Sequence, residues 1–485
     1  MAPPDPYCTS LAPELAARRC AGLRTQLAGA GLFASPAAAE GTAHQATTSW
    51  RISPCPLFLS PDQLTFFQNL GPQLLTFYRA LNRLYLDSVK GTQPAWVARY
   101  LDQGKPDSLV TYSRMKRFRD DLPAVIRPDV IPTQDGMVIT ELDSVPGGIG
   151  LTACLSMLYG NLDDPPLALV GGRDGMIERF AAMLQAQQGT KPGCIAVVVS
   201  EEAKDYRPEM TWLTARLRER GLSAYCVEPR EVRFTEEGLQ LHRDGSDRPI
   251  ALVYRFYELF DLLNIPKAEL IQYAVKKDWA AVTPPYKPAL EEKSAFALLH
   301  HPVLRPFWEK ELGGAVFLDL TSIMPRTWLL DPTPIPPSAT IPGLQLGGRA
   351  VTDWRELATA TQKERHYVIK PSGFSELAWG SRGVSVGHDL PQAEWAAAID
   401  QALASFSRTP YILQEFHKGR LFELDYWNPQ NDTMEHMTGR ARLSPYYFVA
   451  GGKAELAGIL ATVCSAEKKV IHGMKDAVMV PCAVR

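Results

Sequence analysis

Three short apolar runs between residues 193 and 260 restrict the fold of this chain more than any other feature of its sequence. GCIAVVVS, LSAYCVEP and IALVYRFYEL are each largely apolar over the length of one strand, and a helical stretch over residues 207–221 ends at Gly221 between the first two. Runs of this kind are typical of buried strands joined by helices in a parallel sheet. We therefore expect an α/β (α+β) fold in which residues 191–280 form a smaller α/β domain.

Helical periodicity dominates an earlier segment. Between Pro61 and Gln103, apolar side chains recur every three or four residues, which is the spacing of one helix face. Gly71 and Pro72 interrupt this pattern, and proline removes a backbone donor inside a helix. The segment is therefore predicted to form two helices or one kinked helix. Residues 1–50 are rich in Ala, Pro and Gly, and we expect an N-terminal arm or one loosely packed helix there.

A hairpin followed by a glycine-rich turn is predicted further along the chain. The segments AVIRPDVIP and MVITELDSV are rich in strand-forming residues and flank the turn signal TQDG. PGGIG and the apolar segment LTACLSMLYG come next, so that a strand continues through a turn into a helix. In the last third, YVIKPSG, YILQEF, ARLSPYYFV and KAELAGILATV are predicted strands, and the proline-rich residues 331–343 are a predicted surface loop.

Composition narrows the class of protein. The 485 residues correspond to about three domain-sized units. With 51 Lys and Arg against 53 Asp and Glu, the chain lacks the basic balance of a dedicated nucleic-acid-binding protein. Its eight cysteines form no Cys-x-x-Cys motif and are expected to be reduced thiols. The sequence has no apolar span of about 18 residues and no signal-peptide pattern, so the expected location is the cytoplasm.

Four charged residues of the predicted hairpin form the first candidate site. Arg127 and Asp129 are two positions apart, as are Glu141 and Asp143, so each pair lies on one face of its strand. Pairing of the two strands would gather three carboxylates and a guanidinium. Close carboxylates repel each other unless a cation lies among them, and Mg²⁺ prefers such oxygen ligands. Each of these residues, taken alone, would equally suit a solvent-facing strand.

The glycine-rich turn is a second candidate site, for a substrate. Gly147 and Gly148 precede a predicted helix, and glycine allows the backbone to approach an anionic ligand at a helix N-terminus. A glycine pair after a strand also forms an ordinary tight turn, and no GK[ST] sequence of a P-loop follows.

Charged residues in the second half of the chain are candidates for binding a nucleotide. Lys370 ends an apolar strand, Glu376 follows it by six positions, and the loop from Gly380 to Gly387 carries Arg382. Such a combination would suit a nucleotide with its metal, although a lysine beside a hairpin turn also extends readily into solvent. Further candidates, each with a solvated helix or sheet face as the alternative, are Lys293, Gln414, Glu415, Arg440 and Arg442.

Together these segments resemble the circularly permuted ATP-grasp ligases, most closely the synthetase domain of glutathionylspermidine synthase and more distantly eukaryotic glutathione synthetase. RPD at residues 127–129 and ELD at residues 141–143 are similar to the Arg-x-Asp and Glu-x-Asn of the family's metal site. TPPYKPALEEK and YVIKPSGFSEL are similar to its two lysine segments, and YILQEF to the strand that carries its nucleotide hinge. The matching order extends over residues 120–443.

The resemblance implies an ATP-dependent ligase that joins a carboxylate to an amine through an acyl phosphate and releases ADP and phosphate. It implies an ATP-grasp fold in circularly permuted order, with the metal hairpin in residues 51–190 and with the ATP-binding lysines and a lid loop in residues 281–485. The site that the resemblance implies comprises Arg127 as the catalytic residue; Lys293, Lys370 and Glu415 or its neighbour Gln414 around ATP; and Asp129, Glu141, Asp143 and Glu376 around one or two Mg²⁺ ions. The residue patterns described above add Arg382 as a candidate around ATP, and Gly147, Gly148, Arg440 and Arg442 as candidates around the substrates.

Three departures from the family pattern leave alternatives open. Asp143 replaces the usual Asn, Leu377 replaces a Gly, and PGGIG replaces an Asp-x-Pro-Thr segment near the acceptor substrate. An ATP-grasp kinase, a degenerate nucleotide-binding protein and a structural interaction protein are therefore alternatives to a ligase. The expected partners are a small-molecule or peptide carboxylate and an amine, with neither nucleic acid nor membrane. The sequence does not define these substrates or the oligomeric state.

Overall fold

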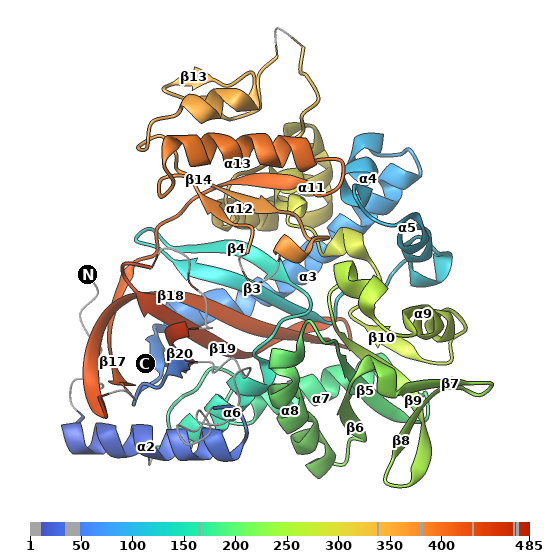
Figure 1. The fold of residues 1–485 in the computed structure, drawn as a ribbon, viewed down its shortest axis with the longest axis vertical. Coiled ribbons are helices and arrows are strands. Elements are labelled where there is room, and N and C mark those ends of the chain that lie inside the picture. The colour runs from blue at the N-terminus through green and yellow to red at the C-terminus, as the bar shows by residue number, and fades with distance from the viewer. Residues whose placement is uncertain are drawn as a thin grey trace.

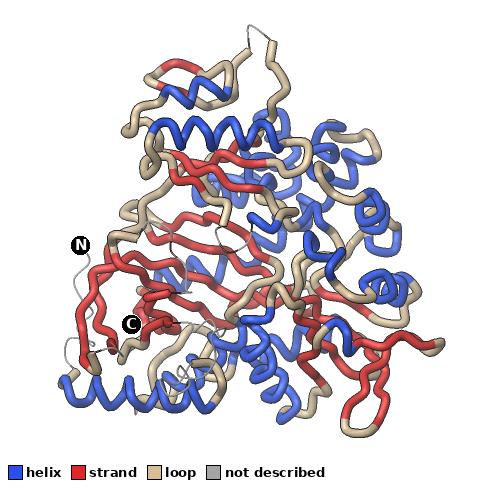
Figure 2. Tube along the Cα trace, viewed as in Figure 1, coloured by secondary structure: helices blue, strands red, loops and turns tan. Residues whose placement is uncertain are grey.

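Strands in the described part of the chain form three larger sheets and one two-stranded sheet (Figure 1). The computed structural model has a mixed α/β architecture, and Figure 2 shows helices packed around the sheets. The structure describes residues 11–33, 49–163, 166–336, 339–378, 380, 382–428, 431–468, 471 and 475–485.

The largest sheet has eight strands among the described residues and joins the two ends of the chain. Its order is β1-β20-β19-β18-β3-β4, with β17 paired to β18 and β2 paired to β20. The strands are β1 (Ser49–Arg51), β2 (Leu57–Leu59), β3 (Val125–Pro132), β4 (Met137–Asp143), β17 (Leu421–Asn428), β18 (Thr433–Ala450), β19 (Lys453–Ser465) and β20 (Lys475–Val484). The predicted hairpin is therefore present as β3 and β4, and β4 lies at one edge of the sheet.

A six-stranded sheet, counted over the described residues, contains the three apolar runs. Strand β5 pairs in parallel with β6 and β9, and β9 pairs in parallel with β10, which confirms the predicted parallel sheet. Tight turns at residues 236–237 and 244–245 add an antiparallel extension through β7 and β8 that the sequence analysis did not predict. The strands are β5 (Cys194–Val199), β6 (Ala224–Val227), β7 (Val232–Thr235), β8 (Gly238–Arg243), β9 (Ser246–Phe256) and β10 (Ala281–Thr283).

The third sheet is antiparallel and has the order β11-β16-β14-β15. Helix α13 (Gln392–Ser405) lies along it at the top of Figure 1, and its Trp395 is fully buried there. The predicted strands YVIKPSG and YILQEF correspond to β14 and β16. The strands are β11 (Thr327–Leu329), β14 (Tyr367–Pro371), β15 (Ser385–Val386) and β16 (Tyr411–Glu415), and the two-stranded sheet is β12 (Gln345–Leu346) with β13 (Arg349–Ala350).

Helices surround these sheets, and among the described residues none is long and apolar enough to cross a membrane. The other α-helices are α2 (Pro13–Gly29), α3 (Pro61–Val89), α4 (Ala95–Asp102), α5 (Asp107–Ser113), α6 (Ile149–Tyr159), α7 (Gly175–Gln188), α8 (Arg207–Glu219), α9 (Ala268–Lys276), α10 (Ser294–His300), α11 (Arg305–Leu312) and α12 (Gly314–Ile323). The 3₁₀ helices are η2 (Lys116–Phe118), η3 (Lys204–Tyr206), η4 (Pro229–Glu231), η5 (Leu259–Asn264), η6 (Pro288–Leu290), η7 (Pro302–Leu304), η8 (Trp354–Thr359) and η9 (Glu376–Ala378).

Helix α3 continues unbroken through Gly71 and Pro72, so the alternative of two separate helices at this point is wrong. The helix starts with a reciprocal cap, because Gln63 N donates to Ser60 Oγ and Ser60 N donates to Gln63 Oε1. Gly71 packs directly on the ring of Tyr447 in β18, where an added Cβ would lie 2.5 Å from a ring carbon. Close packing of this helix on the large sheet thus outweighs the backbone donor lost at Pro72.

The predicted N-terminal arm contains helix α2, and this helix is anchored by buried Cys20, Leu23 and Leu27. The rest of the arm, at residues 1–10 and 34–48, lies outside the described residues. The seven cysteines that the structure describes are unbridged, as expected. The domain boundaries near residues 50, 190 and 280 stay predictions.

Substitution of Gly71 tests the close approach of α3 to the sheet. Because a Cβ would overlap the Tyr447 ring, Gly71→Ala is expected to lower the free energy of unfolding by about 1–3 kcal/mol. Gly22→Ala is the matched control in α2, since no atom lies within 4 Å of its added Cβ. The control is expected to raise stability by up to about 1 kcal/mol. Denaturant unfolding measures both, and equal changes would contradict the packing.

Candidate functional site

The β3–β4 hairpin places its four predicted charged residues next to one another. In the antiparallel register, Arg127 lies opposite Asp143 and Asp129 lies opposite Glu141. Cross-strand neighbours of this kind lie about 5 Å apart at Cβ. The geometric part of the sequence prediction therefore holds, because one patch of the hairpin gathers a guanidinium and three carboxylates.

A bulge follows the charged patch along the hairpin. Val130 pairs with Ile139, so Thr140 is an extra residue on β4. The Thr140 hydroxyl donates to the Asp129 backbone oxygen at 3.3 Å. The Thr140 carbonyl accepts from Lys370 Nζ at 3.2 Å. The bulge thus links the edge of the large sheet to strand β14 of the antiparallel sheet.

Arg127 lies between two of the carboxylates. Its Nη2 is 2.6 Å from Asp143 Oδ2, and its Nη1 is 3.3 Å from Asp129 Oδ1. From β18, Arg442 Nη1 reaches Asp129 Oδ2 at 3.1 Å, and Ser444 Oγ donates to Asp129 Oδ1 at 3.1 Å. Burial alone would raise the pKa of Asp129, but the two guanidinium groups outweigh it and hold that pKa below its usual value. Burial dominates at Asp143 and raises its pKa.

Lys293 approaches the remaining carboxylate of the hairpin. Its Nζ is 2.8 Å from Glu141 Oε1 and donates to the Ala378 carbonyl at 3.2 Å. Burial would lower the pKa of Lys293, but the carboxylate of Glu141 outweighs burial and raises it. The ammonium therefore stays charged beside the hairpin.

Two buried ion pairs hold the segment that carries Lys293. Glu291 pairs with Arg255 of β9, which is fully buried. Glu292 pairs with Lys105 Nζ at 2.5 Å, and both of these side chains are almost completely buried. Removal of one partner from such a pair costs about 3–5 kcal/mol, because the other charge remains buried without compensation. The backbone from which Lys293 extends is accordingly fixed.

Lys370 extends from β14 toward the same hairpin. Its Nζ donates to Gln414 Oε1 at 2.9 Å and to the Thr140 carbonyl at 3.2 Å. Gln414 is oriented by its own bond from Nε2 to Thr327 Oγ1 at 3.2 Å. Burial lowers the pKa of Lys370 to about 8. An anion placed beside this ammonium would raise that pKa again, so Lys370 is suited to bind a phosphate.

A cavity of about 710 Å³ separates the hairpin from the antiparallel sheet. Its size falls within the range of about 300–1,000 Å³ that is typical of ligand sites. Polar residues from both sheets line it, among them several of the predicted site residues. The lining includes Asp129, Thr140, Glu141, His366, Val368, Lys370, Val386, His388, Gln414, Glu415, Phe416, His417, Lys418, Arg440 and Arg442.

A second cavity of about 50 Å³ shares Glu141 with the first. Lys293, Asp143, Glu258 and Glu291 are among the residues that line it. The two cavities together therefore contain three carboxylates of the hairpin and both predicted nucleotide-binding lysines.

The hairpin carboxylates could bind Mg²⁺ only together with ligands supplied by substrate phosphate and water. Among the described residues, no three His, Cys, Asp or Glu side chains are grouped so that they could hold a metal ion by themselves. The hairpin carboxylates are instead paired with Arg127, Arg442 and Lys293. Mg²⁺ in nucleotide sites commonly uses one or two carboxylates and takes its other ligands from phosphate and water. Glu141 and Asp143 fit that form of site.

Other predicted site residues lie at the margin or outside the two cavities. Glu376 is exposed at the start of η9 and does not line either cavity, so the structure does not bring it to the hairpin carboxylates. Arg382 Nη1 is 3.0 Å from Glu202 Oε1, which lies beyond the end of β5. Arg440 lines the large cavity but donates to the carbonyls of Gly419 and Ala466.

The glycine-rich turn has a partner within the protein. Glu209 of α8 accepts from Gly148 N at 2.7 Å and from Leu151 N at 2.9 Å, so the N-terminus of α6 is capped by this carboxyl group. Gly147 packs against the ring of Tyr206, where an added Cβ would lie 2.0 Å from a ring carbon. The predicted role of Gly147 and Gly148 in substrate binding stays a prediction, and the donor of Gly148 is already in use.

Sequence analysis missed Glu209 for a physical reason. This residue is 61 positions from Gly148, and its own segment reads as an ordinary amphipathic helix. A carboxylate in a helix normally faces solvent, and only the packing of α8 on α6 buries it. Burial raises the pKa of Glu209 to about 7, although the two backbone donors act in the opposite direction.

Comparisons with known proteins bear on the fold. Neither protein-family models nor curated proteins match the sequence. Among solved structures, a glutathione synthetase-like effector from Globodera pallida in its apo form matches with a TM-score of 0.59 and 13% identity, over 99% of this chain and 100% of that chain. The chain shares the fold of that effector. A candidate gamma-glutamylcysteine synthetase from Methylobacillus flagellatus KT matches at 12% identity, over 87% of this chain and 89% of that chain. Its TM-score of 0.41 is too low to support a shared fold.

The pH dependence of unfolding tests the burial of Glu209. Its pKa is raised from a usual 4.5 to about 7, so the native state holds the proton more tightly than the unfolded chain. Its contribution to stability is complete below pH 4.5 and is lost as the pH rises through 7, at about 1.4 kcal/mol per pH unit within that window.

Wild-type protein is therefore expected to lose more unfolding free energy between about pH 5 and about pH 8 than the Glu209→Gln variant, which cannot ionise. Denaturant titrations at the two pH values give the difference. The same decline in both proteins would show that the carboxyl is not buried in this way.

Proposed function

We propose that this chain is an ATP-dependent carboxylate–amine ligase of the ATP-grasp type, with its elements in circularly permuted order. One observation carries the proposal. A cavity large enough for a nucleotide lies between two sheets, and buried or half-buried cations and carboxylates alternate at the hairpin side of it. The fold shared with a glutathione synthetase-like effector supports the proposal by analogy.

Lys370 and Arg442 are proposed to bind the phosphates of ATP, together with Lys293 from the adjoining cavity. Lys370 is the most suitable of these, because burial leaves its ammonium short of compensating charge. The large cavity is also lined by Val368, Val386 and Phe416, which suit the flat apolar faces of a nucleobase. Gln414 would then position Lys370 rather than contact the base directly.

The proposed chemistry has two steps. An oxygen of the substrate carboxylate attacks the γ-phosphorus of ATP, the bond to the bridging oxygen breaks, and ADP leaves. The nitrogen of the amine then attacks the carbonyl carbon of the acyl phosphate, phosphate leaves, and the nitrogen loses a proton. Arg127 would orient the acyl phosphate with its forked donors, and the cations of the site would offset the charge that accumulates on the transferred group.

Glu141 and Asp143 would hold Mg²⁺, which would supply positive charge to stabilise the phosphoryl group during its transfer. The loop that contains Arg382 would exclude water from the acyl phosphate, which water would otherwise hydrolyse. The contact between Arg382 and Glu202 supports this role, because it joins that loop to the six-stranded sheet across the site.

Thermal unfolding with ATP and Mg²⁺, with each alone and with neither, tests the nucleotide site. A ligand at about 100 times its Kd stabilises the native state by about 2.7 kcal/mol, so a Mg²⁺-dependent rise in Tm is expected. The Glu141→Ala variant is expected to lose this rise, because Glu141 lines both cavities.

Glu376→Ala is the matched control for Glu141→Ala. It removes an exposed carboxylate outside both cavities, so it should keep the rise in Tm. Loss of the rise in the control would instead make Glu376 a metal ligand. No rise in folded wild-type protein would overturn the proposed function, and binding without ADP release over a broad panel of acids and amines would favour a nucleotide-binding protein.

Arg127→Lys tests the catalytic assignment while keeping the positive charge between Asp129 and Asp143. Loss of the forked guanidinium is expected to lower kcat by about 100-fold or more, with Kd for ATP changed by less than about threefold. The assay is ADP release with the acid and amine that support turnover in wild type. Wild-type kcat in this variant would remove Arg127 from the mechanism.

A further inference from the structure

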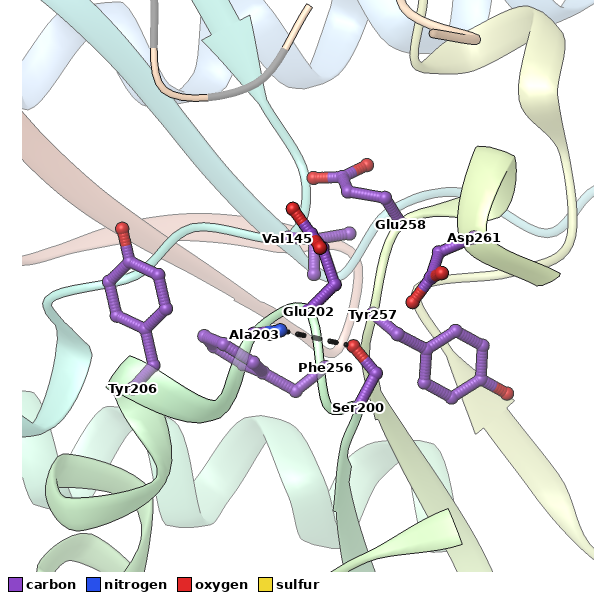
Figure 3. A pocket seen from close by; sticks show the side chains of 9 residues that line it. All are labelled: Val145, Ser200, Glu202, Ala203, Tyr206, Phe256, Tyr257, Glu258 and Asp261. Atoms are coloured by element: carbon purple, nitrogen blue, oxygen red, sulfur yellow. Dashed lines mark hydrogen bonds between the residues drawn. The ribbon is translucent and has the colours of Figure 1, made fainter. Parts of the chain in front are cut away.

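A third cavity lies beside the proposed reaction centre and has a volume of about 20 Å³ (Figure 3). This is enough space for one group of about the size of a water molecule. The carboxylates of Glu202, Glu258 and Asp261 line it, and Val145 and Glu258 also line the cavity that contains Lys293 and Asp143. Glu258 therefore lies between the small cavity and the reaction centre.

The three carboxylates of this cavity differ in their partners. Glu202 is paired with Arg382 Nη1 at 3.0 Å, and Asp261 accepts from Asn264 Nδ2 at 2.9 Å. The Glu258 side chain makes no hydrogen bond or ion pair with any residue that the structure describes. Unpaired carboxylates in such surroundings are costly, and a cationic ligand would supply the missing charge.

Charge near Glu258 also favours a cation over an anion. Burial, with the nearby carboxyls of Glu291 and Asp143, raises the pKa of Glu258 well above its usual value. Two positive groups, Arg255 and Lys293, act on Glu258 in the opposite direction but do not offset burial and the two carboxyls. Both positive groups already have carboxylate partners of their own, at Glu291 and Glu141 respectively.

Aromatic rings complete the wall of the small cavity. Tyr206 and Phe256 line it, with ring centroids 5.6 Å apart, and the phenol of Tyr257 points away from Glu258 in Figure 3. Ring faces attract ammonium groups and offer no donor competition to a carboxylate. An anionic or purely apolar group would gain nothing from Glu258 here.

We propose that the Glu258 carboxylate binds the ammonium group of the acceptor amine, takes one proton from it, and so directs the lone pair of the resulting amine nitrogen toward the acyl phosphate. This inference rests on the proposed function, since it assigns one substrate group to the same site. Glu258 contacts substrate in this scheme, whereas Asp261 and Glu202 shape the cavity. The acceptor is therefore a primary amine that is cationic when it binds.

Binding of n-propylammonium chloride tests the inference without knowledge of the natural acceptor, and 1-propanol is the neutral probe of similar shape. Titrations monitored by ligand-observed NMR are made with the intact protein in ATP and Mg²⁺. Wild type is expected to bind the ammonium probe more tightly than the alcohol. Glu258→Gln is expected to weaken binding of the ammonium probe by about tenfold, because a charged hydrogen bond is lost.

Asp261→Asn is the matched control, because it neutralises a carboxylate of the same cavity that already has an internal partner. Its affinity for n-propylammonium should stay within about twofold of wild type. Glu258→Asp keeps the charge and is expected to bind the probe better than Glu258→Gln, which separates loss of charge from disturbed folding.

The ATP-dependent rise in Tm of each variant distinguishes the two proposals. Retained ATP binding with lost ammonium binding in Glu258→Gln supports the inference. Equal affinity of wild type and Glu258→Gln for n-propylammonium overturns the inference. It is also overturned if wild type binds n-propylammonium no more tightly than 1-propanol. Neither result would count against the nucleotide site. Absence of ATP binding in wild type would instead overturn the proposed function.

Discussion

Two consecutive carboxylates, Glu291 and Glu292, link the six-stranded sheet to the antiparallel sheet of this protein. Glu291 is neutralised by Arg255 from the six-stranded sheet, and Glu292 by Lys105 from the helical region after α4. Glu292 also accepts from Gly373 N at 3.1 Å, which follows strand β14 of the antiparallel sheet. Buried charges tolerate little displacement of their partners, so this segment fixes where Lys293 meets the hairpin.

The site around the hairpin is organised by alternating charge. Guanidinium and ammonium groups separate the carboxylates. Arg127 and Arg442 hold the pKa of Asp129 low and Glu141 holds the pKa of Lys293 high, so that Asp129 and Lys293 both stay charged. A polyanion such as ATP can bind to these cations only where it replaces a neutral hydrogen-bond partner rather than a carboxylate. Lys370 is the clearest example, since its ammonium is held by an amide and a carbonyl rather than by a carboxylate.

Sequence analysis recovered the parts of the site that are local in the chain. The hairpin, the strand that carries Lys370 and the parallel core of the six-stranded sheet follow from patterns within a few tens of residues. Glu209 and Glu258 could not be found in this way, because their surroundings come from elements far apart in sequence. Packing also decided the path of α3, where Tyr447 rather than Pro72 sets the geometry. Local propensity is a weak guide wherever long-range burial dominates.

The spacing of β4 beyond the bulge at Thr140 makes this hairpin sensitive to insertion and deletion. Side chains alternate between the two faces of a strand, so loss of Leu142 would place Glu141 and Asp143 on opposite faces of β4. A substitution at one of these positions would alter one charge, whereas this single-codon deletion would separate the two carboxylates. Relatives that keep the chemistry should therefore vary the turn between β3 and β4 in length while they conserve the distance from the bulge to the end of β4.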